Sequence, residues 1–284
     1  MKIKDFKNLQ EILLQIMDDI HRVCVKNNLR YYLIGGSALG AKRNNGIIPW
    51  DDDIDIAMPR EDYYKFIHIY SKDLDKKFSV LSPDTVNNFR FPHALVVLNH
   101  SMIAYKVELE RPEMTRYGIF VDILPLDCCP IHEYLQVRQE NALKRIKKIK
   151  YYKYFPIHKE NSPLVVLAKR IIRRVFSVYT TNYLNRRQHK IMQKYNNAED
   201  VLCWCSMASH CSYKKLMMPI SYFGTPKLAD FSGRQYYVPE QLENYLTHLF
   251  GNYWEIPSEE KQQAQINSIA YYIYDGFKIS AEND

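Results

Sequence analysis

Residues 48–58 read IPWDDDIDIAM and place four carboxylates within five positions, at Asp51, Asp52, Asp53 and Asp55. Like charges this close repel one another, and their burial costs free energy, so the segment favours a bound cation. In an extended chain alternate side chains share a face, which puts Asp51, Asp53 and Asp55 together and turns Asp52 away. The intervening isoleucines then face a core. An acidic surface turn is the alternative, but the strict alternation favours a strand that offers oxygen ligands to Mg²⁺ or Mn²⁺.

A glycine turn precedes the acidic run. Residues 31–34, YYLI, predict a short strand, and residues 35–40, GGSALG, predict a turn and the start of a helix. Such a turn presents backbone N–H groups and the Ser37 hydroxyl to an anion, and Gly36 lets the backbone approach a phosphate. The turn is neither a Walker loop nor a G-x-G-x-x-G fingerprint. The turn and the acidic strand together predict a phosphate site beside a metal site.

A third carboxylate lies inside an apolar run. Residues 119–124 read IFVDIL, and an acid among large apolar side chains is costly unless it is paired or bound to a metal. Asp122 either pairs with an arginine or caps a loop, or it joins Asp53 and Asp55 from an adjacent strand. Three such carboxylates can hold two metal ions for phosphoryl transfer. Asp127 follows Pro125, so we expect it in a solvated exit loop.

These motifs are similar to those of a known superfamily. Gly36-Ser37 followed by DIDI at residues 53–56 resembles the signature of the nucleotidyltransferases. The longer pattern from Leu33 to Tyr63, together with GIFVDILPLD at residues 118–127, resembles the LicD family. That family includes bacterial phosphocholine transferases that decorate cell-surface glycans, and it is related to the fukutin-type proteins.

The resemblance implies a chemistry and a set of site residues. It implies a CDP-linked donor such as CDP-choline, and Mg²⁺ (or Mn²⁺) held by the catalytic residues Asp53, Asp55 and Asp122. It also implies that a donor phosphate lies against Gly36 and Ser37. The remaining substrate contacts that we expect are Arg43, which adds positive charge, and Trp50. The aromatic residues Trp50, Tyr117 and Trp254 could surround a quaternary ammonium, stack on a sugar, or simply pack.

The implied function is transfer of phosphocholine or a similar phospho-substituent to a cell-surface glycan, in lipopolysaccharide, teichoic acid or capsule modification. Two alternatives stay open: a nucleotidyltransferase acting on a small molecule or RNA, and a non-catalytic scaffold at the membrane. The sequence shows no RNA-binding module, which disfavours a nucleic-acid partner.

Two segments depart from the family pattern where donor or acceptor contacts are expected. Residues 91–97 read FPHALVV, which we interpret as apolar where the resemblance implies a lysine. Residues 256–265 read IPSEEKQQAQ, without the histidine that the resemblance implies. Neither change touches the predicted metal site.

The chain-wide pattern predicts an α/β fold, with a nucleotidyltransferase-like mixed sheet flanked by helices and a mostly helical C-terminal half. Apolar residues at helical spacing predict an opening helix. Further strands are expected at 78–81, 94–98, 102–107 and 119–124. We expect a catalytic core at residues 1–130 and a basic accessory region at 131–284 that completes the active-site cleft.

The second half carries a basic amphipathic segment. Residues 164–179 place apolar side chains on one helical face and four cations opposite, at Lys169, Arg170, Arg173 and Arg174. This pattern is typical of a helix on an anionic membrane or of a core-packed helix with a solvated face. The formal net charge of +7 suits anionic partners. With no signal peptide and no apolar stretch long enough to span a bilayer, we expect a cytoplasmic protein with peripheral contact at the inner face of the membrane.

Overall fold

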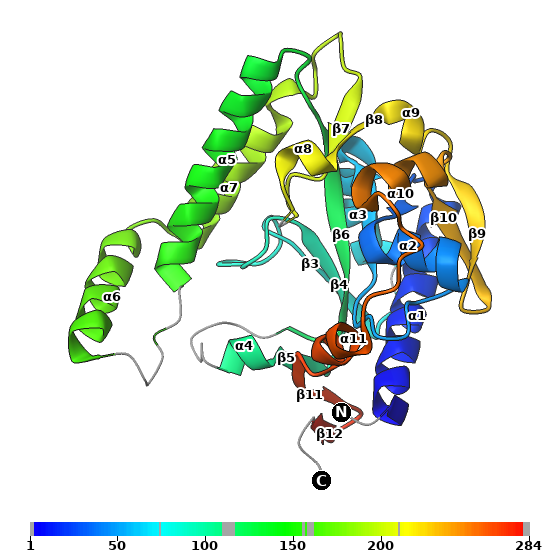
Figure 1. Cartoon of the computed structure of the whole chain (residues 1–284), viewed down its shortest axis with the longest axis horizontal. Coiled ribbons are helices and arrows are strands. Elements are labelled where there is room, and N and C mark those ends of the chain that lie inside the picture. Colours follow the sequence, from blue (N-terminus) through cyan, green and yellow to red (C-terminus); the bar gives the residue numbers. More distant parts are fainter. Residues whose placement is uncertain are drawn as a thin grey trace.

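The computed structural model describes residues 3–73, 75–109, 117–154, 157, 162–209 and 211–280. A mixed sheet forms its centre (Figure 1). The strands of this sheet are β1 (Tyr32–Leu33), β2 (Asp55–Pro59), β3 (Phe78–Leu81), β4 (Ala94–Leu98), β6 (Phe120–Cys128), β7 (Cys203–Cys205) and β8 (Met217–Pro219). Their order is β1-β2-β6-β4-β3, with β7 paired to the end of β6 and β8 paired to β7. The α/β fold with a mixed sheet is confirmed.

One pair of strands in this sheet is parallel. β2 and β6 run in the same direction, whereas the other pairings of this sheet are antiparallel. A parallel pair needs a crossover connection. Here the crossover contains the helix α3 (Arg60–Asp73) and the strands β3 and β4. Both parallel strands therefore begin at the same edge of the sheet, and the acidic residues lie at that edge.

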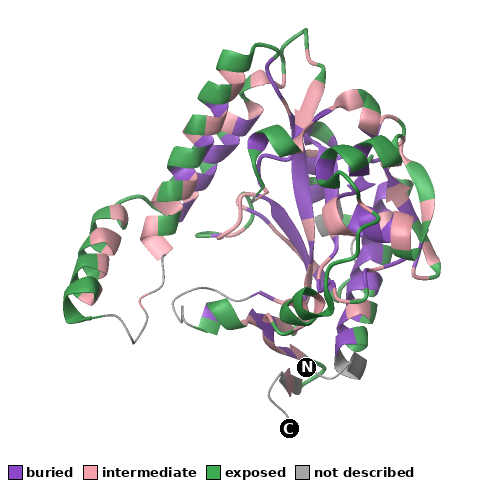
Figure 2. Ribbon diagram, viewed as in Figure 1, coloured by how far each residue is buried: buried purple, intermediate pink, exposed green. Residues whose placement is uncertain are grey.

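The helices α1 (Ile3–Lys26) and α3 both pack against the sheet, and they also contact each other. One face of α1 is buried (Figure 2). Leu9, Leu13 and Ile16 are at most 1% exposed. The helix ends where Asn28 adopts a left-handed conformation, with φ of 52°. The predicted opening helix is confirmed, and it supplies the apolar layer beneath the acidic edge.

The second half contributes helices and further strands. The helices are α5 (Glu133–Tyr154), α6 (Pro163–Phe176), α7 (Thr181–Met192), α8 (Tyr213–Leu216), α9 (Ile220–Phe223), α10 (Leu242–Phe250) and α11 (Glu259–Ile266), with a 3-10 turn at Gln193–Tyr195. The strands β9 (Lys227–Phe231) and β10 (Arg234–Val238) form a separate two-stranded sheet. A third sheet joins β5 (Met102–Tyr105) to β11 (Ile269–Tyr274) and β12 (Phe277–Ser280), and α4 (Lys106–Leu109) follows β5.

Both halves share one hydrophobic core. The main cluster of buried apolar residues extends from Phe6 to Tyr272, and β7 and β8 extend the sheet that the first half begins. The helix α10 packs on α2 (Gly35–Asn44), so the second half also covers the glycine turn. The division at residue 130 stays a prediction, and the contacts across it are extensive.

The strand expected over the acidic run is shorter than predicted. Residues 51–54 form no regular strand, and β2 begins at Asp55. The backbone there is held by a side chain of α1: the Gln10 amide donates to the carbonyls of Ile48 and Asp51, at 3.1 and 2.9 Å. A bond from another element therefore replaces the ladder that a strand would have provided.

The expectation for Asp127 is wrong. β6 continues through Pro125 to Cys128, and Asp127 is completely buried. β4 begins at Ala94, which pairs with Ile123 of β6. Pro125 therefore has no partner in β4, and β6 tolerates a proline there. The Arg60 Nε donates to Asp127 Oδ1 at 2.8 Å, and the Asn196 amide donates to the same oxygen at 2.8 Å. Asp127 therefore anchors the start of α3 to the end of β6.

We expect Asp127→Ala to lower the free energy of unfolding by about 3–5 kcal/mol, because Arg60 would be left as a buried, uncompensated charge. Urea denaturation followed by circular dichroism measures this. Glu133→Ala is the matched control, since Glu133 pairs with Lys214 in an exposed bridge with side chains 74% and 65% accessible. That change should cost less than about 1 kcal/mol. Equal losses in the two variants would contradict the assigned role.

Candidate active site

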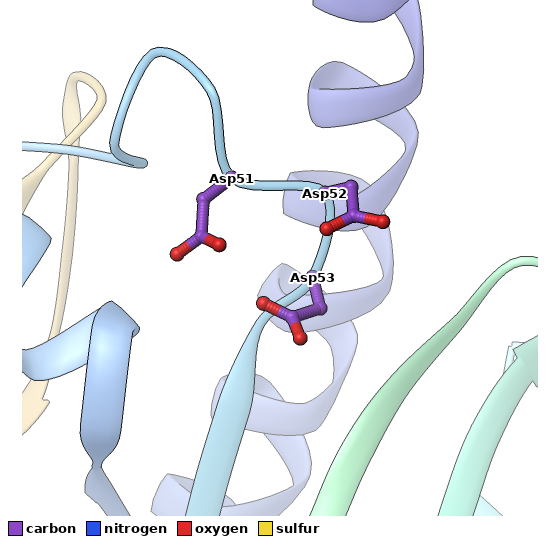
Figure 3. A group of neighbouring side chains, drawn as sticks. All are labelled: Asp51, Asp52 and Asp53. Atoms are coloured by element: carbon purple, nitrogen blue, oxygen red, sulfur yellow. The ribbon is translucent and has the colours of Figure 1, made fainter. Parts of the chain in front are cut away.

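The loop that precedes β2 carries three neighbouring carboxylates. Asp51, Asp52 and Asp53 each offer an oxygen atom, and these atoms lie within 4.8 Å of one another (Figure 3). Among the described residues, no other group of three or more His, Cys, Asp and Glu side chains has the spacing of a metal site. The expectation that Asp52 turns away is wrong, because its carboxylate lies in the same group as those of Asp51 and Asp53. Asp51 and Asp52 are each only 8% exposed.

Two further carboxylates lie on the adjoining strands. Asp55 and Asp122 are register partners in the parallel pair of β2 and β6. The Asp122 N–H donates to the Ile54 carbonyl at 3.0 Å, which continues the pairing toward the acidic loop. The prediction that Asp122 lies on the strand next to Asp55 is confirmed, and its part in a metal site stays a prediction. The closest grouping is Asp51–Asp53, and Asp53 is the member that also belongs to the predicted set of Asp53, Asp55 and Asp122.

Burial and mutual repulsion raise the pKa values of these carboxyls. Burial and then Asp52 raise the pKa of Asp51 to about 6. The pKa of Asp53 is raised well above its usual value by burial and then by Asp55, and that of Asp55 by burial and then by Asp122. These buried carboxyl groups hold their protons because burial and the neighbouring carboxylates disfavour the ionised form. Such a set of oxygen donors is suited to a hard divalent cation. The residues present therefore fit Mg²⁺ or Mn²⁺.

A histidine that the sequence analysis missed contacts the third carboxylate. His93 Nε2 lies 2.7 Å from Asp122 Oδ1, and His93 is 7% exposed. Its Nδ1 is buried with no hydrogen-bond partner among the described residues. The interpretation of residues 91–97 as apolar overlooked this side chain. A histidine one position before a predicted strand was the available signal, but only the pairing of β4 with β6 shows which carboxylate it meets.

The C-terminal segment also reaches the acidic loop. The Gln265 amide donates to Asp51 Oδ1 at 2.6 Å, from a position 214 residues away in the chain. Gln265 and His93 lie in the two segments that depart from the family pattern, so the expectation that neither departure touches the acidic residues is wrong. The Tyr105 hydroxyl from β5 hydrogen-bonds Asp52 in turn. Sequence reasoning missed both residues because nothing local marks them.

The glycine turn lies directly against the acids. A Cβ atom at Gly36 would lie 2.6 Å from Asp51 Oδ2, so any other residue would displace that carboxylate. Gly35 adopts a φ of +55°, which favours glycine, and its N–H donates to the Tyr245 hydroxyl at 3.0 Å. The buried Ser37 hydroxyl accepts the Asp55 N–H at 2.9 Å. The positive end of α2 therefore faces the carboxylates, and Ser37 positions Asp55.

A cavity of about 440 Å³ opens beside Asp51, and we call it the Trp50 cavity. Gly36, Arg43 and Trp50 line it, so the structure brings three of the four predicted substrate contacts together. The Arg43 guanidinium carbon lies 5.8 Å from the centre of the Trp50 ring. Tyr117 is not part of this cavity, because it packs on Phe89 in a separate cluster. Trp254 is 56% exposed, and its ring centre lies 5.3 Å from that of Tyr253, which does line the cavity.

Comparison with known proteins connects this geometry to a family. Residues 28–159 match the family model described as LicD/FKTN/FKRP, nucleotidyltransferase domain. These residues form a LicD-family domain. The LicD match contains Gly36, Ser37 and all five carboxylates, but it ends before Gln265.

Three relatives extend the comparison. The chain is 26% identical over 285 aligned positions to the lipopolysaccharide cholinephosphotransferase LicD of Haemophilus influenzae, covering 96% of this chain and all of that protein. It is 47% identical over 57 residues to an uncharacterized protein of Rickettsia typhi, covering 20% of this chain and 18% of that protein. A protein of Rickettsia prowazekii is 50% identical over 50 residues, covering 18% of this chain and 19% of its own length.

The raised pKa of Asp51 predicts a pH-dependent stability difference in metal-free protein. Its folded pKa of about 6 exceeds the ordinary 3.8, so the folded state holds the proton more tightly. Stability is therefore lost as the pH rises through that interval. Asp51→Asn keeps an oxygen for Gln265 and removes the charge. We expect it to unfold like the native protein at pH 4 and to be more stable by about 2–3 kcal/mol at pH 7.5.

Chemical denaturation in EDTA at the two pH values measures this difference. Addition of Mg²⁺ at pH 7.5 should then raise the melting temperature of the native protein more than that of the variant, since a ligand of the folded state stabilises it. A variant less stable than the native protein at pH 7.5 would show that Asp51 is not a strained carboxylate.

Proposed function

We propose that this protein transfers phosphocholine, or a similar phospho-substituent, from a CDP-linked donor to a cell-surface glycan. The observation that carries the proposal is the carboxylate group Asp51–Asp53 lying beside both Asp55 and the Trp50 cavity. The relative from Haemophilus influenzae, a lipopolysaccharide cholinephosphotransferase, matches the chain along nearly its whole length and supports the transferase assignment.

The proposed cation site is centred on Asp53, which belongs both to the group Asp51–Asp53 and to the predicted set of ligands. Mg²⁺ or Mn²⁺ would be held around Asp53, with Asp55 and Asp122 from the paired strands. When bound, the cation would supply charge neutralisation for the donor diphosphate. The amides at the start of α2, from Gly36 and Ser37, point positive partial charge toward a donor phosphate.

The donor would occupy the Trp50 cavity. Trp50, Phe250 and Tyr253 give it aromatic walls, and Arg43 adds a cation. Aromatic faces suit both a pyrimidine ring and a quaternary ammonium. Arg43 is held in place by the carbonyls of Tyr253 and Glu255, to which it donates at 3.3 and 3.2 Å. Substrate orientation thus depends on the C-terminal half.

The chemical step is an in-line displacement. A sugar hydroxyl of the acceptor attacks the phosphorus that carries the choline, the bond to the bridging oxygen breaks, and CMP leaves. We assign Asp122 to accept the hydroxyl proton, because its Oδ1 is oriented by His93 and its second oxygen is not committed to that contact. His93 is therefore a positioning residue for Asp122.

We expect Asp55→Ala to lower the rate of CMP release from CDP-choline, in the presence of a glycan acceptor and Mg²⁺, by roughly a thousandfold or more. Folding should stay intact, because the change removes a buried negative charge from a repulsive group. Asp200→Ala is the control, since Asp200 is exposed and lies outside the site. Near-normal turnover in Asp55→Ala, with unchanged circular dichroism, would overturn the proposed role of the acidic site.

Nucleotidyl transfer is the second candidate, because the same acidic site can direct attack to either phosphorus. Attack on the phosphorus nearer the cytidine would transfer CMP to the acceptor and release phosphocholine. Chromatography of the products from labelled CDP-choline separates the two: free CMP supports phosphocholine transfer, and free phosphocholine supports nucleotidyl transfer. A protein that neither turns over the donor nor binds Mg²⁺ by calorimetry would instead be the non-catalytic scaffold.

We also propose that α6 contacts the inner face of an anionic membrane. No residue of α6 is buried (Figure 2), so the core-packed alternative does not hold. Phe176 stacks on Tyr152 of α5, at 5.3 Å between ring centres. The side chains of Leu164, Leu167 and Ile171 are 79%, 56% and 55% exposed. In the described part of the chain no helix is long and apolar enough to cross a bilayer, so this contact would be peripheral.

Vesicle sedimentation tests the membrane contact. The double variant Leu167→Glu with Ile171→Glu should lose binding to vesicles that contain phosphatidylglycerol, because it removes the apolar stripe and adds negative charge. Leu228→Glu is the control, since Leu228 on β9 is 53% exposed and far from α6 in the sequence. Equal sedimentation of the two proteins would refute the α6 contact.

A further inference from the structure

A second cavity, of about 400 Å³, lies next to Phe91 and Pro92, the two residues that precede His93. We call it the lysine cavity. Lys147 and Lys150 from α5 line it, together with Arg90 and the pair Glu108 and Gln188. Its apolar walls come from Phe91, Pro92, Val107, Tyr151, Tyr154 and Ala208. The volume is that of a small-ligand site.

The two lysines are partly buried and have no carboxylate partner among the described residues. Lys150 Nζ donates to Asn185 Oδ1 and Gln188 Oε1, at 2.6 and 2.7 Å, and both acceptors are neutral amides. Lys147 Nζ donates to the Ser209 carbonyl at 2.6 Å. Residues three apart on a helix are neighbours, so the two ammonium groups repel each other.

Among the described residues that line this cavity, Glu108 is the one carboxylate, and it is already neutralised. Arg90 Nη1 lies 2.7 Å from Glu108 Oε1. The four charged side chains of the described lining therefore leave two positive charges uncompensated. Burial, and for Lys150 also its neighbour, lower the pKa of Lys147 and bring that of Lys150 to about 7. Buried cations held only by neutral groups are costly, and an anionic ligand would relieve that cost.

The position of the cavity relates it to the acidic site. Phe91 and Pro92 form part of its wall, and the next residue, His93, contacts Asp122. The rings of Phe91 and His93 lie 5.2 Å apart. A sugar stacked on Phe91 would thus lie against a ring that neighbours His93, the side chain that orients the proposed base. The Trp50 cavity, in contrast, meets the acids at Asp51.

We propose that the lysine cavity binds a phosphate monoester group carried by the glycan acceptor, with Lys147 and Lys150 as its ligands. This assignment of the acceptor rests on the proposed transfer reaction. The binding site itself does not, because it needs neither donor nor metal. Charged hydrogen bonds from both lysines would hold the phosphate, and the aromatic wall would hold the sugar.

Calorimetry with metal-free protein in EDTA at pH 7 tests the site, with glucose 6-phosphate, inorganic phosphate and glucose as separate probes. We expect glucose 6-phosphate to bind, and Lys150→Met to weaken that binding about tenfold or more. Lys148→Met is the matched control: it removes the same charge from the same helix at an exposed position and should bind as the native protein does. Lys147→Met is a second variant should Lys150→Met lower the melting temperature.

The probes separate the outcomes. Tighter binding of glucose 6-phosphate than of inorganic phosphate supports a phosphorylated sugar, whereas equal binding of the two overturns the sugar contact. Equal binding of glucose and glucose 6-phosphate, or unchanged binding in both lysine variants, overturns the phosphate site. Displacement of glucose 6-phosphate by CDP-choline from metal-free protein would assign the cavity to the donor and overturn its assignment to the acceptor. Failure of CDP-choline turnover with intact glucose 6-phosphate binding would reject the transfer reaction alone.

Discussion

Repulsion among buried carboxylates is the constraint around which the catalytic end of the sheet is arranged. The parallel pairing of β2 and β6 places Asp55 beside Asp122, and the preceding loop brings three more acids to the same edge. Such a concentration of charge is destabilising in a metal-free fold. The neighbouring groups moderate it: Gln265 donates to Asp51, His93 contacts Asp122, and the positive end of α2 faces the acids.

The two cavities approach this edge from different sides. The Trp50 cavity touches the acids at Asp51, and the lysine cavity approaches them through Phe91 and His93. Their chemistry differs accordingly. One combines an arginine with aromatic walls, and the other combines two partly buried lysines with an aromatic wall. A transferase that brings a donor and an acceptor together needs two such sites with the reacting groups between them, and this arrangement supports the proposed reaction.

Local sequence predicted much of the fold, because periodicity and turn chemistry act over short distances. The strands at 78–81 and 94–98 have the predicted bounds, and the opening helix is where its apolar spacing puts it. The adjacency of Asp122 to Asp55 was also predicted. The errors arose where distant contacts override local pattern. Asp127 is buried because it pairs with Arg60. Gln10 donates a hydrogen bond to the Asp51 carbonyl and so holds the loop in which Asp52 lies beside Asp51 and Asp53. His93 and Gln265 could not be placed without knowing which strand and helix lie next to the acids.

The contact between Gln265 and Asp51 makes the catalytic centre a composite of distant parts of the chain. The LicD match ends at residue 159, yet Tyr245 holds the glycine turn and residues 253–265 line the Trp50 cavity and contact its acid. An isolated fragment of residues 28–159 would therefore keep the five aspartates and lose the groups that position them. On the proposed function, exchange of residues 253–265 between relatives would alter the choice of donor while the phosphoryl-transfer chemistry stayed the same. On the proposed function, donor recognition would therefore draw on a segment that lies more than a hundred residues beyond the last of the five aspartates.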